Sequence, residues 1–165
     1  MNPDLHQLLE DGIRRLPEIR KLFMQLKKRK PADLDMIMAD LHDQAFRQID
    51  CLLCGNCCRS LGPRITDRDI ARLSIALRQR PSQLTDNHFR IDEEGDYVFR
   101  SMPCPFLGDD NYCAVYSDRP QACATYPHTD RRRFVQLLDI TLLNVRTCPA
   151  VALITKKLVQ HYSQL

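Results

Sequence analysis

Four of the eight cysteines of this chain lie within eight residues of one another, in the run C-x2-C-x2-C-C. They are Cys51, Cys54, Cys57 and Cys58. Thiolates bind zinc and iron–sulfur clusters tightly, and a two-residue spacer lets successive sulfur atoms converge on one centre. The run therefore predicts a metal or cluster site rather than a part of the hydrophobic core.

The other four cysteines lie farther along the chain, and we expect the fold to bring them in as further ligands: Cys104, Cys113, Cys123 and Cys148. Neighbouring side chains diverge, so Cys57 is expected to share a centre with Cys51 and Cys54, while Cys58 serves a second centre or stands in reserve. All eight cysteines then divide into two four-cysteine sites, or into one site with spare, redox-active thiols.

The spacing favours an iron–sulfur cluster. C-x2-C-x2-C with a distant Cys-Pro is typical of bacterial ferredoxins, and this chain offers Cys104-Pro105 and Cys148-Pro149. The predicted cofactor is a [4Fe–4S] cluster. Zn2+ is the alternative, because four thiolates also suit zinc, although zinc ribbons pair two separate C-x2-C motifs and only one such run is present.

Two other side chains bear on the chemistry. Cys148 stands at the start of the last expected helix, where the helix dipole would lower the pKa of its thiol. His128 follows Cys123 closely and offers a replacement ligand or a hydrogen-bond partner, although lone histidines are more often surface residues. No Ser-His-Asp arrangement or paired carboxylates stand out, so catalytic residues are left unassigned.

Composition restricts the setting and the partners. The chain starts without the basic and apolar segments of a signal peptide, and no stretch approaches the ~18 apolar residues of a membrane span. We therefore expect a cytoplasmic protein with reduced thiols rather than disulfides. With 24 basic and 21 acidic side chains, the formal charge is +3. The sequence does not predict nucleic acid as a partner, because the basic runs at residues 27–30 and 131–133 are short. A protein partner or an electron donor fits the near-balanced charge better.

The elements that must position the cysteines are mostly helices. Apolar residues three or four apart predict helices on either side of Pro17 and again over residues 34–49. Thr66 and Asp69 resemble a capping box that opens a helix running to about residue 80. The last helix is predicted after Thr147.

Two hairpins complete the predicted fold. One spans residues 89–100 around Gly95, and the other spans residues 104–116 and would place Cys104 opposite Cys113. The fold class is mainly α with one or two small β-hairpins, in an irregular cysteine-rich domain stabilised by metal. Residues 1–50 are expected to be a helical extension that packs on the cysteine-cluster domain, residues 51–165.

In this order the motifs resemble those of the CxxCxxCC, or YkgJ-type, cysteine-cluster family. The resemblance covers about residues 51–149 and rests on the opening run, Cys104-Pro-Phe-Leu107, Cys113-Ala-Val-Tyr116-x2-Arg119-Pro120 and Cys123-x2-Tyr126-Pro127. It implies a zinc- or iron-chelating domain whose ligands are the eight cysteines, with Tyr116, Arg119, Pro120, Tyr126 and Pro127 as its scaffold. One departure is Ala124, where many members carry arginine.

Three functions are compatible with these patterns. The first is an iron–sulfur protein for electron transfer, redox sensing or a redox-linked step. The second is a structural zinc interaction module or metal chaperone without catalysis. The third is a component of a cluster-dependent methyltransferase or oxidoreductase, since flagellin lysine methylases are similar in containing a related cysteine cluster; no cofactor-binding signature supports it.

Overall fold

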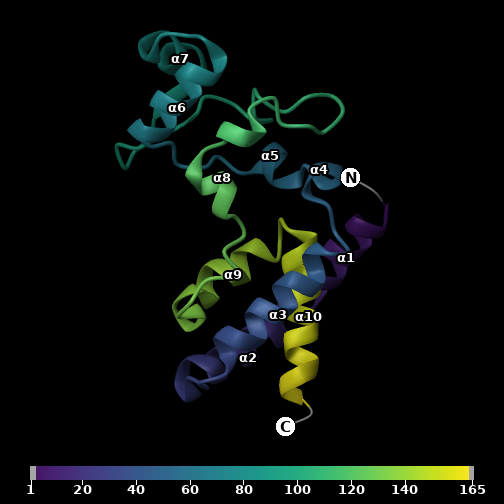
Figure 1. Cartoon of the computed structure of the whole chain (residues 1–165). Coiled ribbons are helices and arrows are strands. Elements are labelled where there is room, and N and C mark those ends of the chain that lie inside the picture. The colour runs from purple at the N-terminus through teal and green to yellow at the C-terminus, as the bar shows by residue number, and fades with distance from the viewer. Residues whose placement is uncertain (1–2, 164–165) are drawn as a thin grey trace. The chain divides into compact units, whose positions relative to one another are not determined.

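The computed structural model describes residues 3–163, and over these residues it is mainly helical with one two-stranded antiparallel sheet. The predicted fold class is thereby confirmed. The chain forms two compact units (Figure 1). The first unit comprises Met1–Cys54 and Pro127–Leu165, and the second comprises Gly55–Tyr126.

The first unit is a helical bundle built around the last helix, α10 (Pro149–Ser163). Four helices pack against α10: α1 (Pro3–Arg14), α2 (Leu16–Arg29), α3 (Leu34–Phe46) and α9 (Leu138–Asn144). Their apolar stripes meet in a core whose fully buried members include Ile19, Met38, Leu138, Val151, Ile154 and Leu158. The apolar residues recur every three or four positions in the sequence because one face of each helix is buried.

Pro17 separates the first two helices as expected. The helix is interrupted between Arg14 and Leu16. Pro17 lies in the first turn of α2, where a backbone N–H has no helical acceptor, so its absence costs no hydrogen bond. At its other end α2 stops at Lys30, which adopts a left-handed conformation and donates its N–H to the Leu26 carbonyl. A sharp turn then leads into α3.

The second unit joins short helices to the sheet. It contains α5 (Asn56–Ser60), α6 (Asp67–Leu77), α7 (Pro81–His88), β1 (Phe89–Ile91), β2 (Tyr97–Phe99), η1 (Tyr116–Asp118) and α8 (Gln121–Thr125). Phe89 pairs with Phe99 across the strands. Their rings belong to a core completed by Ile65, Ile70, Leu73, Leu84, Phe106 and Val115. The first predicted hairpin and the capping box at Thr66 are both present.

The second predicted hairpin is wrong in its register. Cys113 forms its bridge with Leu107, not with Cys104. The tight turn decides this, because the N–H of Gly108 donates to the Tyr112 carbonyl at 2.8 Å. With that closing bond, the residue opposite Cys113 is the one just before Gly108, so Cys104 lies beyond the paired segment.

The boundaries of the two units differ from the motif-based division at residue 50. Residues 1–50 share their core with residues 127–165, because α1, α2 and α3 bury their apolar faces against α10. The cysteine run is itself divided between the units. Cys51 and Cys54 belong to the first unit, and Cys57 and Cys58 to the second.

Gly12 allows α1 and α10 to approach closely. A Cβ at this position would lie 2.5 Å from the Cβ of Ala152. Gly12→Val is expected to lower the free energy of unfolding of the first unit by about 1–3 kcal/mol, through overpacking. Gly62→Val is the control, since a Cβ at Gly62 meets nothing within 4 Å. Equal urea midpoints for the two variants would contradict the close packing.

Candidate metal centre

The CxxCxxCC run folds as two single helical turns joined by Gly55. The first is α4 (Cys51–Cys54), where the N–H of Leu52 donates to the carboxylate of Asp50, and the second is α5. Gly55 adopts the left-handed conformation, with φ at 58°, which glycine enters without steric cost. Residues three apart in a helical turn share a face, so the turn places Cys51 and Cys54 on one side of α4.

Three cysteines lie in the first unit. Cys54 and Cys148 are buried, and Cys51 is exposed. Cys148 precedes α10, and its N–H donates to the Asn144 carbonyl at 2.8 Å. Burial is the main cause that raises the pKa of the Cys148 thiol to about 12, and negative charge on Cys51 and Cys54 contributes to the same rise. These three sulfur atoms therefore lie within electrostatic reach of one another.

The expected lowering of the Cys148 pKa is wrong for the metal-free thiol. The N–H groups of Val151 and Ala150 do favour the thiolate, as a helix start should. Loss of hydration in the interior is the larger effect, because a buried thiolate has no water to stabilise its charge.

The other five cysteines lie in the second unit, and four of them come from separate segments: Cys58, Cys104, Cys113 and Cys123. The N–H of Cys104 donates to the Cys58 carbonyl at 2.8 Å, which ties α5 to the loop that follows the sheet. Cys104 and Cys113 both pack against the apolar core. We refer to these four residues as the second-unit set.

The second-unit set is electrostatically coupled. Burial is the largest cause that raises the pKa of Cys104 to about 11 and of Cys123 to about 12, and it also raises the pKa of Cys113. Negative charge on Cys58 contributes to all three of these pKa shifts. A site that collects sulfur atoms yet opposes their ionisation is one that a cation would complete.

Cys58 differs from the rest of the set. Its pKa is lowered to about 7, chiefly by a hydrogen bond from Cys57, whose Sγ lies 3.9 Å from the Cys58 Sγ. Burial opposes this effect, and the nearby guanidinium of Arg59 assists it. One thiolate is therefore available near neutral pH as the first ligand for an incoming metal.

Backbone N–H groups are aimed at the buried sulfur atoms. Cys104 faces the N–H groups of Phe106 and Leu107, and Cys113 faces that of Val115. Cys148 faces N–H groups two and three residues ahead in the same way. Such donors stabilise a thiolate but do little for a neutral thiol, so the local chain is folded for charged sulfur ligands.

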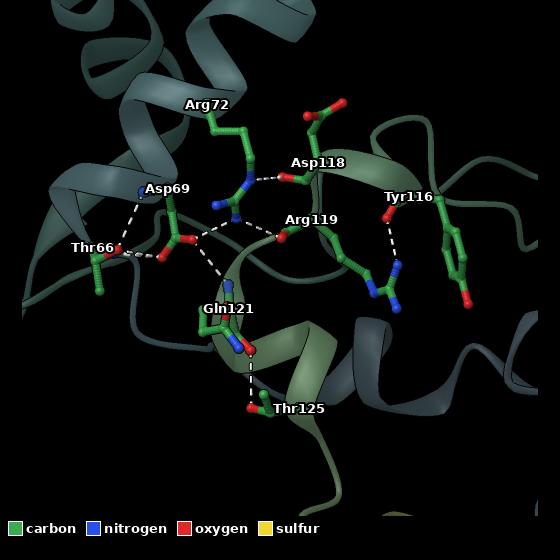
Figure 2. A network of polar contacts seen from close by, with 8 residues as sticks. All are labelled: Thr66, Asp69, Arg72, Tyr116, Asp118, Arg119, Gln121 and Thr125. Carbon is green, nitrogen blue, oxygen red and sulfur yellow. Dashed lines mark hydrogen bonds and ion pairs between the residues drawn. The ribbon is translucent and has the colours of Figure 1, made fainter.

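A polar brace holds the segment between Cys113 and Cys123 (Figure 2). The carboxylate of Asp69 is 1% exposed and accepts hydrogen bonds from Arg72 at 2.7 Å and from the N–H of Gln121 at 2.9 Å. It also accepts bonds from the backbone and hydroxyl of Thr66. Burial alone would raise the pKa of Asp69, but these bonds outweigh it and hold the pKa below its ordinary value.

Arg72 extends the brace to the same segment. It donates to the carbonyl of Asp118 at 3.2 Å and to that of Arg119 at 2.8 Å. Arg119 in turn lies over the ring of Tyr116, 4.0 Å from its centroid. Sequence reasoning identified Asp69 only as a capping residue, because a capping box carries no sign of a partner 52 positions away.

No ready-made ion site is present in residues 3–163: no three cysteine, histidine, aspartate or glutamate side chains are gathered tightly enough to hold a metal as they stand. The donors nevertheless fit thiophilic metal, since they are half-buried and electrostatically coupled, and Cys104 and Cys113 are provided with N–H donors. The assignment of all eight cysteines as ligands stays a prediction. So does a shared centre for Cys57, Cys51 and Cys54.

Comparison with known proteins places the chain in a family. Residues 50–148 match the CxxCxxCC model, described as a "Putative zinc- or iron-chelating domain". The chain belongs to this family, and the predicted resemblance is confirmed. Neither a curated protein nor a solved structure matched the chain. No helix of the described residues is long and apolar enough to cross a membrane.

Removing the charge of Asp69 tests the brace. We expect Asp69→Asn to lower the free energy of unfolding by about 2–3 kcal/mol, because one of its buried donors loses its acceptor. We also expect at least tenfold weaker metal binding in a chelator competition, since residues 118–121 are released. Asp67→Asn, at an exposed position of the same helix turn, removes the same charge and serves as the control. Equal effects of the two changes would show that the brace does not support the site.

Metal affinity should fall steeply with acidification. Cys104, Cys113 and Cys123 have raised pKa values, so each must release a proton when it binds metal. Protons then compete more strongly as the pH falls, and below about pH 7 Cys58 joins them. The apparent Zn2+ affinity of the metal-free protein should fall on the order of 10³-fold from pH 8 to pH 7. A constant affinity over this range would contradict the ligand set.

Proposed function

We propose that the protein is a cytoplasmic iron–sulfur protein that holds a [4Fe–4S] cluster through cysteine thiolates. The cluster serves electron transfer, redox sensing or a redox-linked step. The observation that carries the proposal is the second-unit set, in which four cysteines from separate segments are electrostatically coupled and three half-buried thiols have raised pKa values. Within this set, Cys104-Pro105 supports iron–sulfur over zinc. Outside it, the ferredoxin-like spacing of Cys51, Cys54 and Cys57 favours the same class of cofactor for the chain.

The chain supplies three things to such a cluster. Partial burial of the second-unit set limits the access of water to its sulfur atoms. The N–H groups directed at Cys104 and Cys113 withdraw electron density from the thiolates, an effect that raises the reduction potential of a cluster. The guanidinium groups of Arg59 and Arg119 lie near Cys58 and Cys113 and offset part of the negative charge.

Structural zinc is the second candidate. It is supported by the brace of Asp69 and Arg72, which ties a ligand segment to α6 as a purely structural site requires. Four thiolates around Zn2+ leave no open position for chemistry. The protein would then be an interaction module or a metal chaperone, and removal of zinc would unfold the second unit.

Anaerobic purification separates the two candidates. We expect a brown protein that contains iron and acid-labile sulfide in equal amounts, as in a [4Fe–4S] cluster. Cys113→Ser and Cys123→Ser should each lose the iron and the sulfide of the second-unit set, in the equal amounts expected of a [4Fe–4S] cluster. A colourless anaerobic preparation that contains zinc alone would reject the iron–sulfur proposal and leave the zinc module.

A further inference from the structure

Two basic runs that are about a hundred residues apart in the sequence meet in the first unit. Residues 27–30 end α2, and residues 131–133 lead into η2 (Phe134–Leu137). The carboxylate of Asp35, in the first turn of α3, accepts hydrogen bonds from the N–H groups of Arg133 and Phe134 at 2.7 and 2.8 Å. This contact holds the arginine loop beside the turn that follows Lys30.

A second contact joins α2 to α9, the helix that follows η2. The Nζ of Lys27 lies 2.6 Å from the carboxylate of Asp139 on α9. The helices α2 and α9 pack together, as do α3 and η2 (Figure 1). Each run alone is short, but Asp35 and Asp139 link the elements that carry them, so the two runs lie on neighbouring elements of the first unit.

The basic surface continues along α2. Arg20 and Lys21 lie seven residues before Lys27 and Lys28, so these four exposed side chains form one stripe on the helix. We call the stripe together with the end of α2 and the arginine loop the basic face, which comprises Arg20, Lys21, Lys27, Lys28, Arg29, Lys30, Arg131, Arg132 and Arg133.

Most of these cations have no anionic partner within the protein. Over residues 3–163, Lys27 is the one member of the basic face with an ion pair. The acids nearby are partly committed elsewhere, since both oxygens of Asp35 accept backbone hydrogen bonds and Asp139 faces Lys27. Asp33 and Asp130 also lie near the face, and they leave it with a clear positive excess.

We propose that the basic face binds the phosphodiester backbone of nucleic acid, independently of base sequence. Three consecutive arginines present planar guanidinium groups, which match phosphate oxygens in a two-bond geometry. The stripe on α2 presents cations one and two turns apart, along a helix of about 21 Å. A rod of this kind follows a phosphate backbone or lies in a groove of a duplex.

The apolar surface argues against a membrane as the anionic partner. A helix that lies on a bilayer inserts an apolar face beneath its basic one. In α2 that face is already occupied, because it packs into the bundle: Leu16, Ile19, Leu22, Phe23 and Leu26 are all buried. Met24, 63% exposed, is the one large apolar side chain on the outer face of α2, and a single methionine is no apolar face; the rest of what α2 offers to the outside is polar or charged, which suits a hydrated polyanion.

Fluorescence anisotropy with the full-length protein tests the proposal. The probes are a labelled 20-base-pair DNA duplex and a labelled 20-nucleotide RNA strand, in 50 to 200 mM KCl. We expect binding that weakens with salt in at least one arm, and the arms distinguish the two sources of phosphodiester. Two triple variants, Lys28→Gln/Arg29→Gln/Lys30→Gln and Arg131→Gln/Arg132→Gln/Arg133→Gln, should each lose at least tenfold in affinity and flatten the salt dependence by about two to three phosphate contacts.

The control removes the same charge elsewhere. Arg68→Gln/Arg80→Gln/Arg90→Gln lie exposed in the second unit and should change the affinity less than threefold. Protection of Lys27, Lys28 and Lys30 from acetylation by the bound nucleic acid, read by mass spectrometry on the unmodified chain, checks the face without any substitution. Metal content should be the same in all variants, which separates this proposal from the metal function.

Four results would overturn the proposal. The first is the absence of binding at 50 mM KCl with protein up to 100 μM. The second is an equal loss in the control triple, which would reveal an effect of net charge alone. The third is no protection of the three lysines. The fourth is loss, in the two basic triples, of binding to vesicles with 30% phosphatidylserine or to polyglutamate while nucleic-acid affinity is unchanged.

Discussion

The second unit depends on one physical conflict: partial burial disfavours the thiolate form of its cysteines, yet backbone N–H groups are directed at their sulfur atoms as if these were charged. Burial alone would leave Cys104 and Cys123 as inert thiols. The N–H donors near Cys104 and the guanidinium of Arg59 near Cys58 would stabilise a neutral thiol very little. A bound metal ion or cluster resolves the conflict, because it supplies the positive charge that both the ionised sulfur atoms and the dry surroundings require.

The arrangement of the chain serves this site through contacts between distant segments. The buried carboxylate of Asp69 joins α6 to the segment that leads into α8, and Arg72 grips two carbonyl groups of the same stretch. These bonds set where Cys123 lies, while the turn at Gly108 sets where Cys113 lies. The small apolar core therefore supports this region, and the polar contacts determine where the two cysteines lie.

Local signals in the sequence predicted local features. The helix break at Pro17, the capping box at Thr66 and the strand pair that begins at Phe89 could all be predicted, since each depends on residues close together in the sequence. The cysteine spacing likewise indicated the family and the class of donor. Features that depend on distant partners were not legible. The pairing of Cys113 with Leu107 depends on one turn bond, and the raised pKa of Cys148 depends on burial.

The meeting of the two basic runs is a further case. In the sequence, each basic run has the pattern of a solvated helix end. The hydrogen bonds from Arg133 and Phe134 to Asp35 show that the second run lies beside the start of α3, close to the first run. The same holds for the cysteines. Spacing predicts a shared centre for Cys51, Cys54 and Cys57, whereas the compact units place Cys57 with the second-unit set and leave Cys51 and Cys54 with Cys148. Sequence indicates which residues do chemistry, and tertiary contacts decide which of them act together.

X-ray absorption on the anaerobically purified full-length protein tests the central claim most directly. The account predicts a metal whose nearest neighbours are sulfur atoms alone, at about 2.3 Å, with partial loss of that signal in Cys58→Ser. Oxygen or nitrogen neighbours in place of sulfur, or a spectrum unchanged by the loss of Cys58, would contradict it.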